Sequence, residues 1–190
     1  MEDDMKACPG MLEHPFYRAW MAGEVSAATL AGYHRSYHEF IRRVPGYWQR
    51  VIDAFQPEFP GEHPVVREER RHILLWEEWG KRMAPPPAFP RLDTLTDALD
   101  AMTPSQLLGA LQSFESQQPE IASTKKEGLL RHYGFSPGEL AYFDEHQNEE
   151  AHITFGRNLA ARHADRGEFE DGFVRGSELL FASLDSFQAG

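Results

Sequence analysis

The chain has 190 residues and a mass of 21.7 kDa, with 41% apolar and 26% charged residues. This length and composition fit one globular domain whose core needs no disulfide or structural metal. The formal net charge of −11 would repel a phosphate backbone, so we expect no nucleic-acid partner.

The same sequence predicts neither a membrane segment nor a disulfide. No apolar run approaches the roughly 18 residues that a membrane span needs, and the acidic start differs from the basic start of a signal peptide. Cys8 is the single cysteine, so an intrachain disulfide is impossible. We therefore expect a cytoplasmic protein with no membrane partner.

Helical periodicity runs through most of the chain, and no segment indicates a strand. Capping residues, prolines and glycines bound the predicted helices at 26–41, 47–55, 64–83, 92–102, 103–133, 136–167 and 169–187. Thr103 and Ser136 each precede a proline and stand three residues before a Gln or Glu, a pattern typical of a helix start. We predict an all-α, single-domain bundle over 11–190, preceded by a flexible N-terminus over 1–10.

Two Glu-x-x-His pairs are the main chemical signal: Glu69 with His72, and Glu149 with His152. Residues three apart project from nearly the same helix face, so each pair can offer a carboxylate oxygen and an imidazole nitrogen to one metal. His146 precedes the second pair, and Glu115 lies four residues before Pro119, which predicts a helix kink beside that carboxylate. Such donors suit a carboxylate-bridged dinuclear site.

Each of these groups also has an interpretation without metal. Glu68 precedes His72 by one helical turn, so either Glu68 or Glu69 can be the ligand. Arginines on the same helix could hold both carboxylates in surface ion pairs. The polar run 144–150 favours solvent exposure of the second pair, and Glu115 could equally face solvent.

Three segments resemble a known family. They are Met11–Tyr17 with Trp20, Gly23 and Tyr33, then Phe114–Pro119 through Lys125, and Ala141–His146. Together they are similar to the haem-oxygenase-like superfamily, which includes TenA, PqqC and dinuclear oxidases, and most similar to the family of the chlamydial protein associating with death domains (CADD). The resemblance spans roughly 11 to 187. It implies a seven-helix haem-oxygenase-like bundle with two metal ions, Fe/Fe or Fe/Mn, and dioxygen as co-substrate.

Carried over residue by residue, the resemblance also implies roles for single side chains. The implied metal ligands are Glu69 (or Glu68), His72, Glu115, His146, Glu149 and His152. The implied reaction forms para-aminobenzoate, a folate precursor, from the enzyme's own tyrosine and lysine. The sacrificed tyrosine would be Tyr17, with Tyr33 as its redox neighbour, Tyr142 as a further active-site tyrosine and Lys125 as amino donor. In an ideal helix the side chain of Lys126, rather than that of Lys125, would point in nearly the same direction as Glu115. The assignment of Lys125 as amino donor therefore requires the helix to kink at Pro119.

Two other functions remain open on the sequence. The first is an oxidase that acts on an external small molecule, as PqqC-like proteins and amino- or fatty-acid oxidases do. The second is a non-catalytic helical interaction module. For an oxygenase we expect an external reductant as partner, and a homodimer as the assembly.

Overall fold

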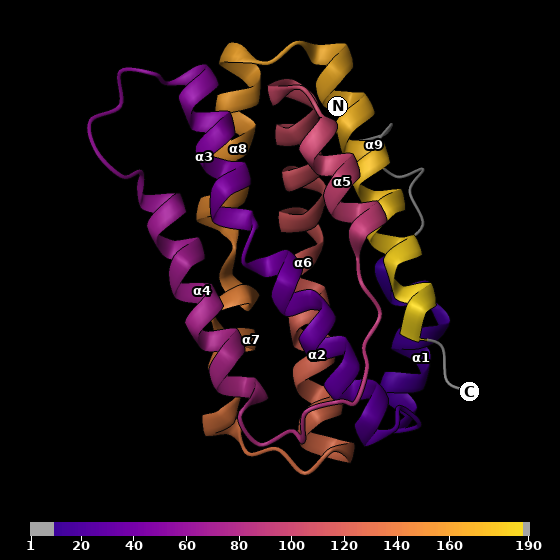
Figure 1. Cartoon of the computed structure of the whole chain (residues 1–190). Coiled ribbons are helices and arrows are strands. Elements are labelled where there is room, and N and C mark those ends of the chain that lie inside the picture. Colours follow the sequence, from indigo (N-terminus) through magenta and orange to yellow (C-terminus); the bar gives the residue numbers. More distant parts are fainter. Residues whose placement is uncertain (1–9, 188–190) are drawn as a thin grey trace.

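The computed structural model describes residues 10–187, and these fold into helices joined by turns, with no β-strand in this range (Figure 1). The predicted flexible N-terminus lies outside the described residues except for Gly10, as does Cys8. The all-α prediction is confirmed. Among the described residues, no helix is long and apolar enough to cross a membrane.

Nine α-helical segments follow one another along the described part of the chain. They are α1 (Pro15–Ala22), α2 (Ala27–Ile41), α3 (Val44–Phe55), α4 (Pro64–Gly80), α5 (Asp93–Ala101), α6 (Pro104–His132), α7 (Ala141–Glu145), α8 (Glu150–His163) and α9 (Arg166–Ser183). If α2 with α3, and α7 with α8, are each counted as one interrupted rod, these segments make the seven rods of the predicted bundle. Pro45, which stands between the predicted helices 26–41 and 47–55, lies in the first turn of α3, just after the end of α2.

Local signals account for several helix ends. The Ser26 hydroxyl accepts a hydrogen bond from the Thr29 amide at the start of α2. At the start of α6, Thr103 and Gln106 form a reciprocal capping box. Helix α1 was not predicted: its cap is His14, whose ring nitrogen accepts from the Phe16 amide, and histidine is an uncommon residue at this position.

The predicted continuous helix over 136–167 is wrong. Ser136 opens only a 3-10 turn, Pro137–Glu139, and α7 and α8 are then separated by a second 3-10 turn, His146–Asn148. In one ideal helix, residues 146, 149 and 152 would spread over an arc of about 120°. The break changes the helical phase between them, which lets all three side chains face the interior.

Helix α6 is the longest element and packs against α1, α3, α8 and α9 (Figure 1). It continues through Pro119, so the Glu115 carbonyl has no backbone N–H from residue 119 to accept. Its contact with α9 is so close that a Cβ on Gly172 would lie 2.0 Å from the Gln106 carbonyl oxygen. Glycine is required there by lack of space rather than by backbone conformation.

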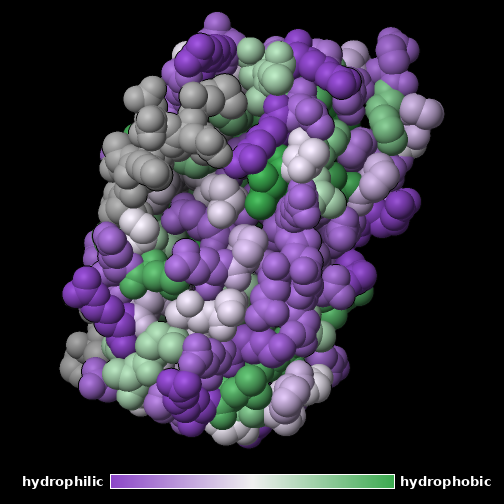
Figure 2. All heavy atoms as spheres, turned by 180° about the vertical axis from the view of Figure 1, so that it is seen from behind, coloured by the Kyte–Doolittle hydropathy of each residue, from purple (hydrophilic) through white to green (hydrophobic). Residues whose placement is uncertain are grey.

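The face opposite the view of Figure 1 is largely hydrophilic, with hydrophobic residues scattered over it (Figure 2). Large apolar side chains with substantial exposure are isolated among the described residues: Phe59, Leu74, Leu130 and Val174. Single exposed apolar residues are ordinary on a folded surface. The expected homodimer therefore stays a prediction.

Candidate metal centre

Six potential ligands meet where the α7–α8 rod packs against both α4 and α6 (Figure 1). Helix α4 supplies Glu69 and His72, α6 supplies Glu115, and the rod around the second 3-10 turn supplies His146, Glu149 and His152. All six are buried, with exposed fractions of only 2–6%. The interpretations that placed Glu115 and the second Glu-x-x-His pair in solvent are wrong.

These six residues form two groups of three, and within each group the potential ligand atoms lie within 4.8 Å of one another. One is the Glu69 group, which consists of Glu69, Glu115 and His152, and the other is the His72 group, which consists of His72, His146 and Glu149. Each Glu-x-x-His pair is therefore divided between the groups, instead of serving one metal as its spacing suggested.

The divided pairs also join the two groups. Glu69 Oε2 lies 3.4 Å from His72 Nδ1, and Glu149 Oε2 lies 3.2 Å from His152 Nδ1. Each of these carboxylates thus touches a histidine of the other group. A carboxylate in that position can bridge two neighbouring cations, which is the arrangement that a dinuclear site needs.

The electrostatics of the two groups fit bound cations. Among the described residues, no lysine or arginine pairs with Glu69, Glu115 or Glu149. Burial raises the pKa of Glu115 and, with the Glu115 charge added, raises the pKa of Glu149 to about 8. Protons therefore neutralise charges that metal ions could neutralise instead.

His152 gives the most direct sign that the two groups suit metal ions. Burial lowers its pKa, but the surrounding carboxylates outweigh burial and raise the pKa to about 10. Its Nδ1 is buried without a well-formed hydrogen bond, although oxygens of three carboxylates lie 3.2–3.8 Å away. An imidazole nitrogen that faces carboxylates at these distances suits a shared metal ion between them. The residues present therefore fit two metal ions.

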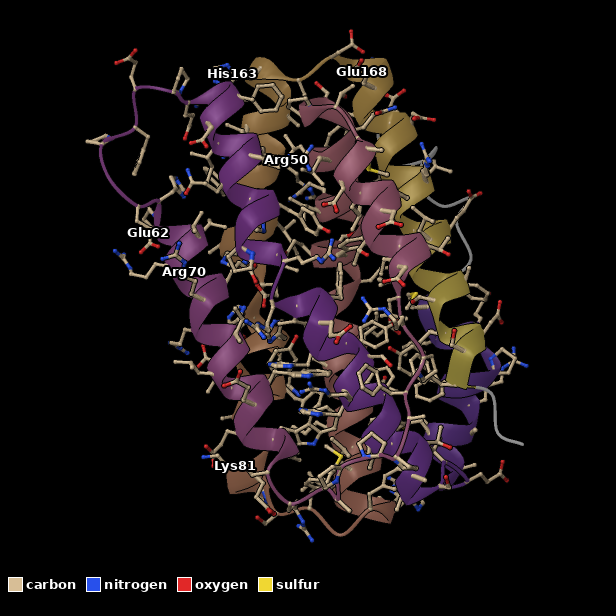
Figure 3. All side chains as sticks on the ribbon, viewed as in Figure 1. Arg50, Glu62, Arg70, Lys81, His163 and Glu168 are labelled. Carbon is tan, nitrogen blue, oxygen red and sulfur yellow. The ribbon has the colours of Figure 1, made fainter. Side chains whose placement is uncertain are left out.

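Glu68 lies outside both groups. Its side chain is 46% exposed and lines a cavity of about 210 Å³ that also reaches His72, Glu149 and His152. The expected arginine ion pairs go elsewhere: Arg70 pairs with Glu62 at 2.6 Å on the outer side of α4, where Figure 3 labels both. Arg71 pairs with Glu145. Of the two candidates on α4, Glu69 is thus the one within the buried donor set.

A second, smaller cavity of about 40 Å³, here called the tyrosine chamber, contains the predicted catalytic residues. Its lining includes Tyr17, Tyr33, Lys125 and Tyr142, all of which are buried. The Lys125 Nζ lies 5.5 Å from the centre of the Tyr17 ring and 5.1 Å from that of Tyr33. Lys126 instead pairs with Asp144, so the chamber contains the lysine that the family resemblance indicated.

Tyr142 connects the chamber with the His72 group. Its ring centre lies 4.0 Å from that of His146, and its backbone carbonyl lies 2.7 Å from His146 Nδ1. The Trp76 ring also contacts Tyr142, with the two ring centres 4.8 Å apart. Tyr142 thus both lines the chamber and contacts a member of the His72 group.

Sequence reasoning missed Tyr37 as a chamber residue. Its ring centre lies 4.5 Å from that of Tyr33, one helical turn earlier on α2, and its hydroxyl is 2.6 Å from the Ser183 hydroxyl. The i to i+4 spacing from Tyr33 was the available signal. Burial raises the pKa of all four chamber tyrosines, which keeps the phenols protonated, and lowers the pKa of Lys125 to about 7.

Solved structures share this architecture. A domain of unknown function from Shewanella denitrificans, described as having a heme oxygenase-like fold, matches with a TM-score of 0.69 at 17% identity, over 93% of this chain and 85% of that one. A TenA homolog from Pseudomonas syringae matches with a TM-score of 0.68 at 12% identity, over 93% and 86%. This chain has a haem-oxygenase-like fold.

Curated proteins named 4-aminobenzoate synthase resemble this haem-oxygenase-like chain in sequence. The protein of Chlamydia muridarum is 29% identical over 93% of this chain and 84% of its own length, and that of Chlamydia trachomatis is 28% identical over 93% and 86%. The Nitrosomonas europaea protein is 27% identical over 72% and 67%. No family model matches the chain. The predicted resemblance to the haem-oxygenase-like superfamily and its chlamydial branch is confirmed.

Proposed function

We propose that this chain is a dinuclear iron or iron/manganese oxygenase that forms 4-aminobenzoate, with its own Tyr17 as ring source and Lys125 as amino donor. The name of the chlamydial and Nitrosomonas relatives supports the product. The observation that carries the proposal is the enclosure of Tyr17, Tyr33 and Lys125 in one chamber beside the two donor groups.

The two groups offer carboxylate and imidazole ligands in the mixture that iron and manganese accept. Glu69, Glu115 and His152 would hold one ion, and His72, His146 and Glu149 the other. When bound, such ions supply the redox chemistry that activates dioxygen, and an external reductant would restore them.

The chamber residues prepare the two organic reactants. Burial keeps the Tyr17 and Tyr33 phenols protonated, so each retains the O–H hydrogen that an oxidant could remove. Because burial lowers the pKa of Lys125 to about 7, a substantial fraction of its amine is neutral at physiological pH and has a free lone pair with which the nitrogen can react. The aromatic walls exclude water from both.

The size of the chamber favours an internal substrate. Its volume of about 40 Å³ is far below the roughly 300–1,000 Å³ of typical small-molecule sites. An external substrate of the PqqC or fatty-acid type would therefore require the helices to separate. The six buried donors have no lysine or arginine partner among the described residues, which also weighs against a non-catalytic module, because nothing in such a module would offset the cost of burying them.

Isotope labelling tests the proposal. Protein produced with ring-¹³C tyrosine and ¹⁵N lysine is loaded with Fe(II) and Mn(II), supplied with a reductant and exposed to dioxygen. We expect released 4-aminobenzoate that carries both labels, and a matching loss of mass from the protein. Unlabelled product would overturn the internal source, and the absence of product from fully metal-loaded protein would overturn the function.

A further inference from the structure

Glu68 is the exposed neighbour of the buried ligand Glu69, and it contacts a potential metal ligand on another helix. Its Oε2 lies 3.1 Å from His152 Nε2, across the gap between α4 and α8. The opposite ring nitrogen, Nδ1, faces Glu69, Glu115 and Glu149. The imidazole is thus held between one outer carboxylate and the buried donor set.

The proton positions follow from this geometry. An ionised carboxylate only accepts hydrogen bonds, so the contact with Glu68 requires a proton on His152 Nε2. A metal binds only the neutral imidazole, whose single ring N–H is then on Nε2, so the Nδ1 lone pair is left for the metal. That lone pair then points at the Glu69 group.

His146 shows the complementary arrangement in the other group. The Tyr142 carbonyl can only accept, so His146 Nδ1 donates to it at 2.7 Å and Nε2 is left for a metal, 3.7 Å from Glu149 Oε1. Both histidines therefore have an outer partner that decides which nitrogen is free. For His146 this partner is a backbone carbonyl, whereas for His152 it is the side chain of Glu68.

We infer that Glu68 is a positioning residue, which accepts the Nε2–H of His152 and so presents Nδ1 to the metal of the Glu69 group. The inference rests on the proposed function, because it requires a metal in that group. An outer carboxylate also makes the imidazole a more basic ligand. Helix α4 thus contributes two adjacent acids with different roles, Glu69 to the metal and Glu68 to the histidine.

The test compares Glu68→Ala with Glu145→Ala. Glu145 lines the same cavity and is exposed, but its side chain pairs with Arg71 and forms no hydrogen bond or ion pair with any of the six donors. Removing the Glu145 carboxylate changes the charge of the cavity by the same amount as removing the Glu68 carboxylate. Because Glu68 is exposed on a helix and alanine favours helices, we expect the Glu68 variant to fold, which circular dichroism checks.

Mn(II) titration, with free Mn(II) followed by electron paramagnetic resonance, measures affinity without turnover. We expect Glu68→Ala to weaken Mn(II) binding by roughly 10–100-fold, the range seen when outer partners of ligands are removed. Glu68→Gln retains an accepting oxygen, so its loss should be smaller. Glu145→Ala should bind as the unmodified protein does.

¹⁵N NMR spectroscopy of the histidine side chains in the Zn(II)-loaded protein provides a second measurement. We expect a protected His152 Nε2–H resonance that Glu68→Ala loses and Glu145→Ala retains. Unchanged Mn(II) affinity in Glu68→Ala, or equal losses in both alanine variants, would overturn the positioning role and leave the proposed function standing. Failure of the unmodified protein to bind Mn(II) or Fe(II) would overturn the metal centre and this inference with it.

Discussion

The side-chain nitrogen of Lys125 lies 5.5 Å from the centre of the Tyr17 ring, and both residues are buried. Among the described residues, no carboxylate forms an ion pair with this lysine, so nothing compensates for the desolvation of its charged form. The lowered pKa of Lys125 is the physical consequence, and it turns a usually charged group into an amine that can react.

Lys125→Met should change how stability depends on pH. The pKa of Lys125 is about 7 in the folded chain against a usual 10.5, so between these values the unfolded chain binds the proton and the folded chain does not. This group therefore makes stability rise with pH in that window, by up to roughly 1.4 kcal/mol per pH unit. Urea unfolding at pH 7 to 9.5 should show a weaker rise in the variant.

Lys126→Met is the matched control for that experiment. Its side chain is 23% exposed and pairs with Asp144, so we expect the slope to remain that of the unmodified protein. Equal slopes for Lys125→Met and the unmodified protein would contradict a neutral buried amine.

Tyr17→Phe should abolish 4-aminobenzoate formation while leaving metal binding unchanged, because phenylalanine fills the same space but has no phenolic hydrogen. Tyr37→Phe is the control. Tyr37 lines the same chamber, but its hydroxyl contacts Ser183. Mass spectrometry of product from metal-loaded proteins measures both. Product from Tyr17→Phe at the level of the unmodified protein would remove Tyr17 as ring source.

Single substitutions in the two donor groups should each remove one metal. Glu115→Ala affects the Glu69 group and His146→Ala the His72 group. We expect the metal content to fall from two ions toward one in each variant, and toward none in the double variant. Elemental analysis of protein loaded with Fe(II) or Mn(II) checks this, and the rise in Tm on loading should shrink accordingly. Full occupancy in Glu115→Ala would contradict the grouping.

Gly172→Ala should destabilise the bundle. Its Cβ would lie 2.0 Å from the Gln106 carbonyl oxygen, so α9 would have to move away from α6, at a cost of roughly 1–3 kcal/mol or more. Gly32→Ala inside α2 is the control, since its Cβ would meet no atom within 4 Å. We expect it to be neutral or to stabilise by up to about 1 kcal/mol. Urea unfolding of both variants distinguishes steric crowding from a general effect of alanine.

The sequence by itself determined the helical class, six of the seven rods, most helix starts and the six donors. These features depend on short-range patterns: apolar spacing along a helix, the Ser26 and Thr103 caps, and the Glu-x-x-His spacing. They are readable because a helix forms its hydrogen bonds within a few residues. The missed helix α1, with its His14 cap, marks where such a signal was weak.

Only the tertiary structure decided how those parts combine. The break between α7 and α8, the division of the donors into two groups, the separate roles of Glu68 and Glu69, and the burial of Lys125 in place of Lys126 all depend on which helix faces which. Adjacent residues such as Glu68 and Glu69 have the same local pattern. The fold distinguishes them by burying Glu69 and leaving Glu68 half-exposed, because burial is a property of the surface that neighbouring helices cover and not of the residue itself.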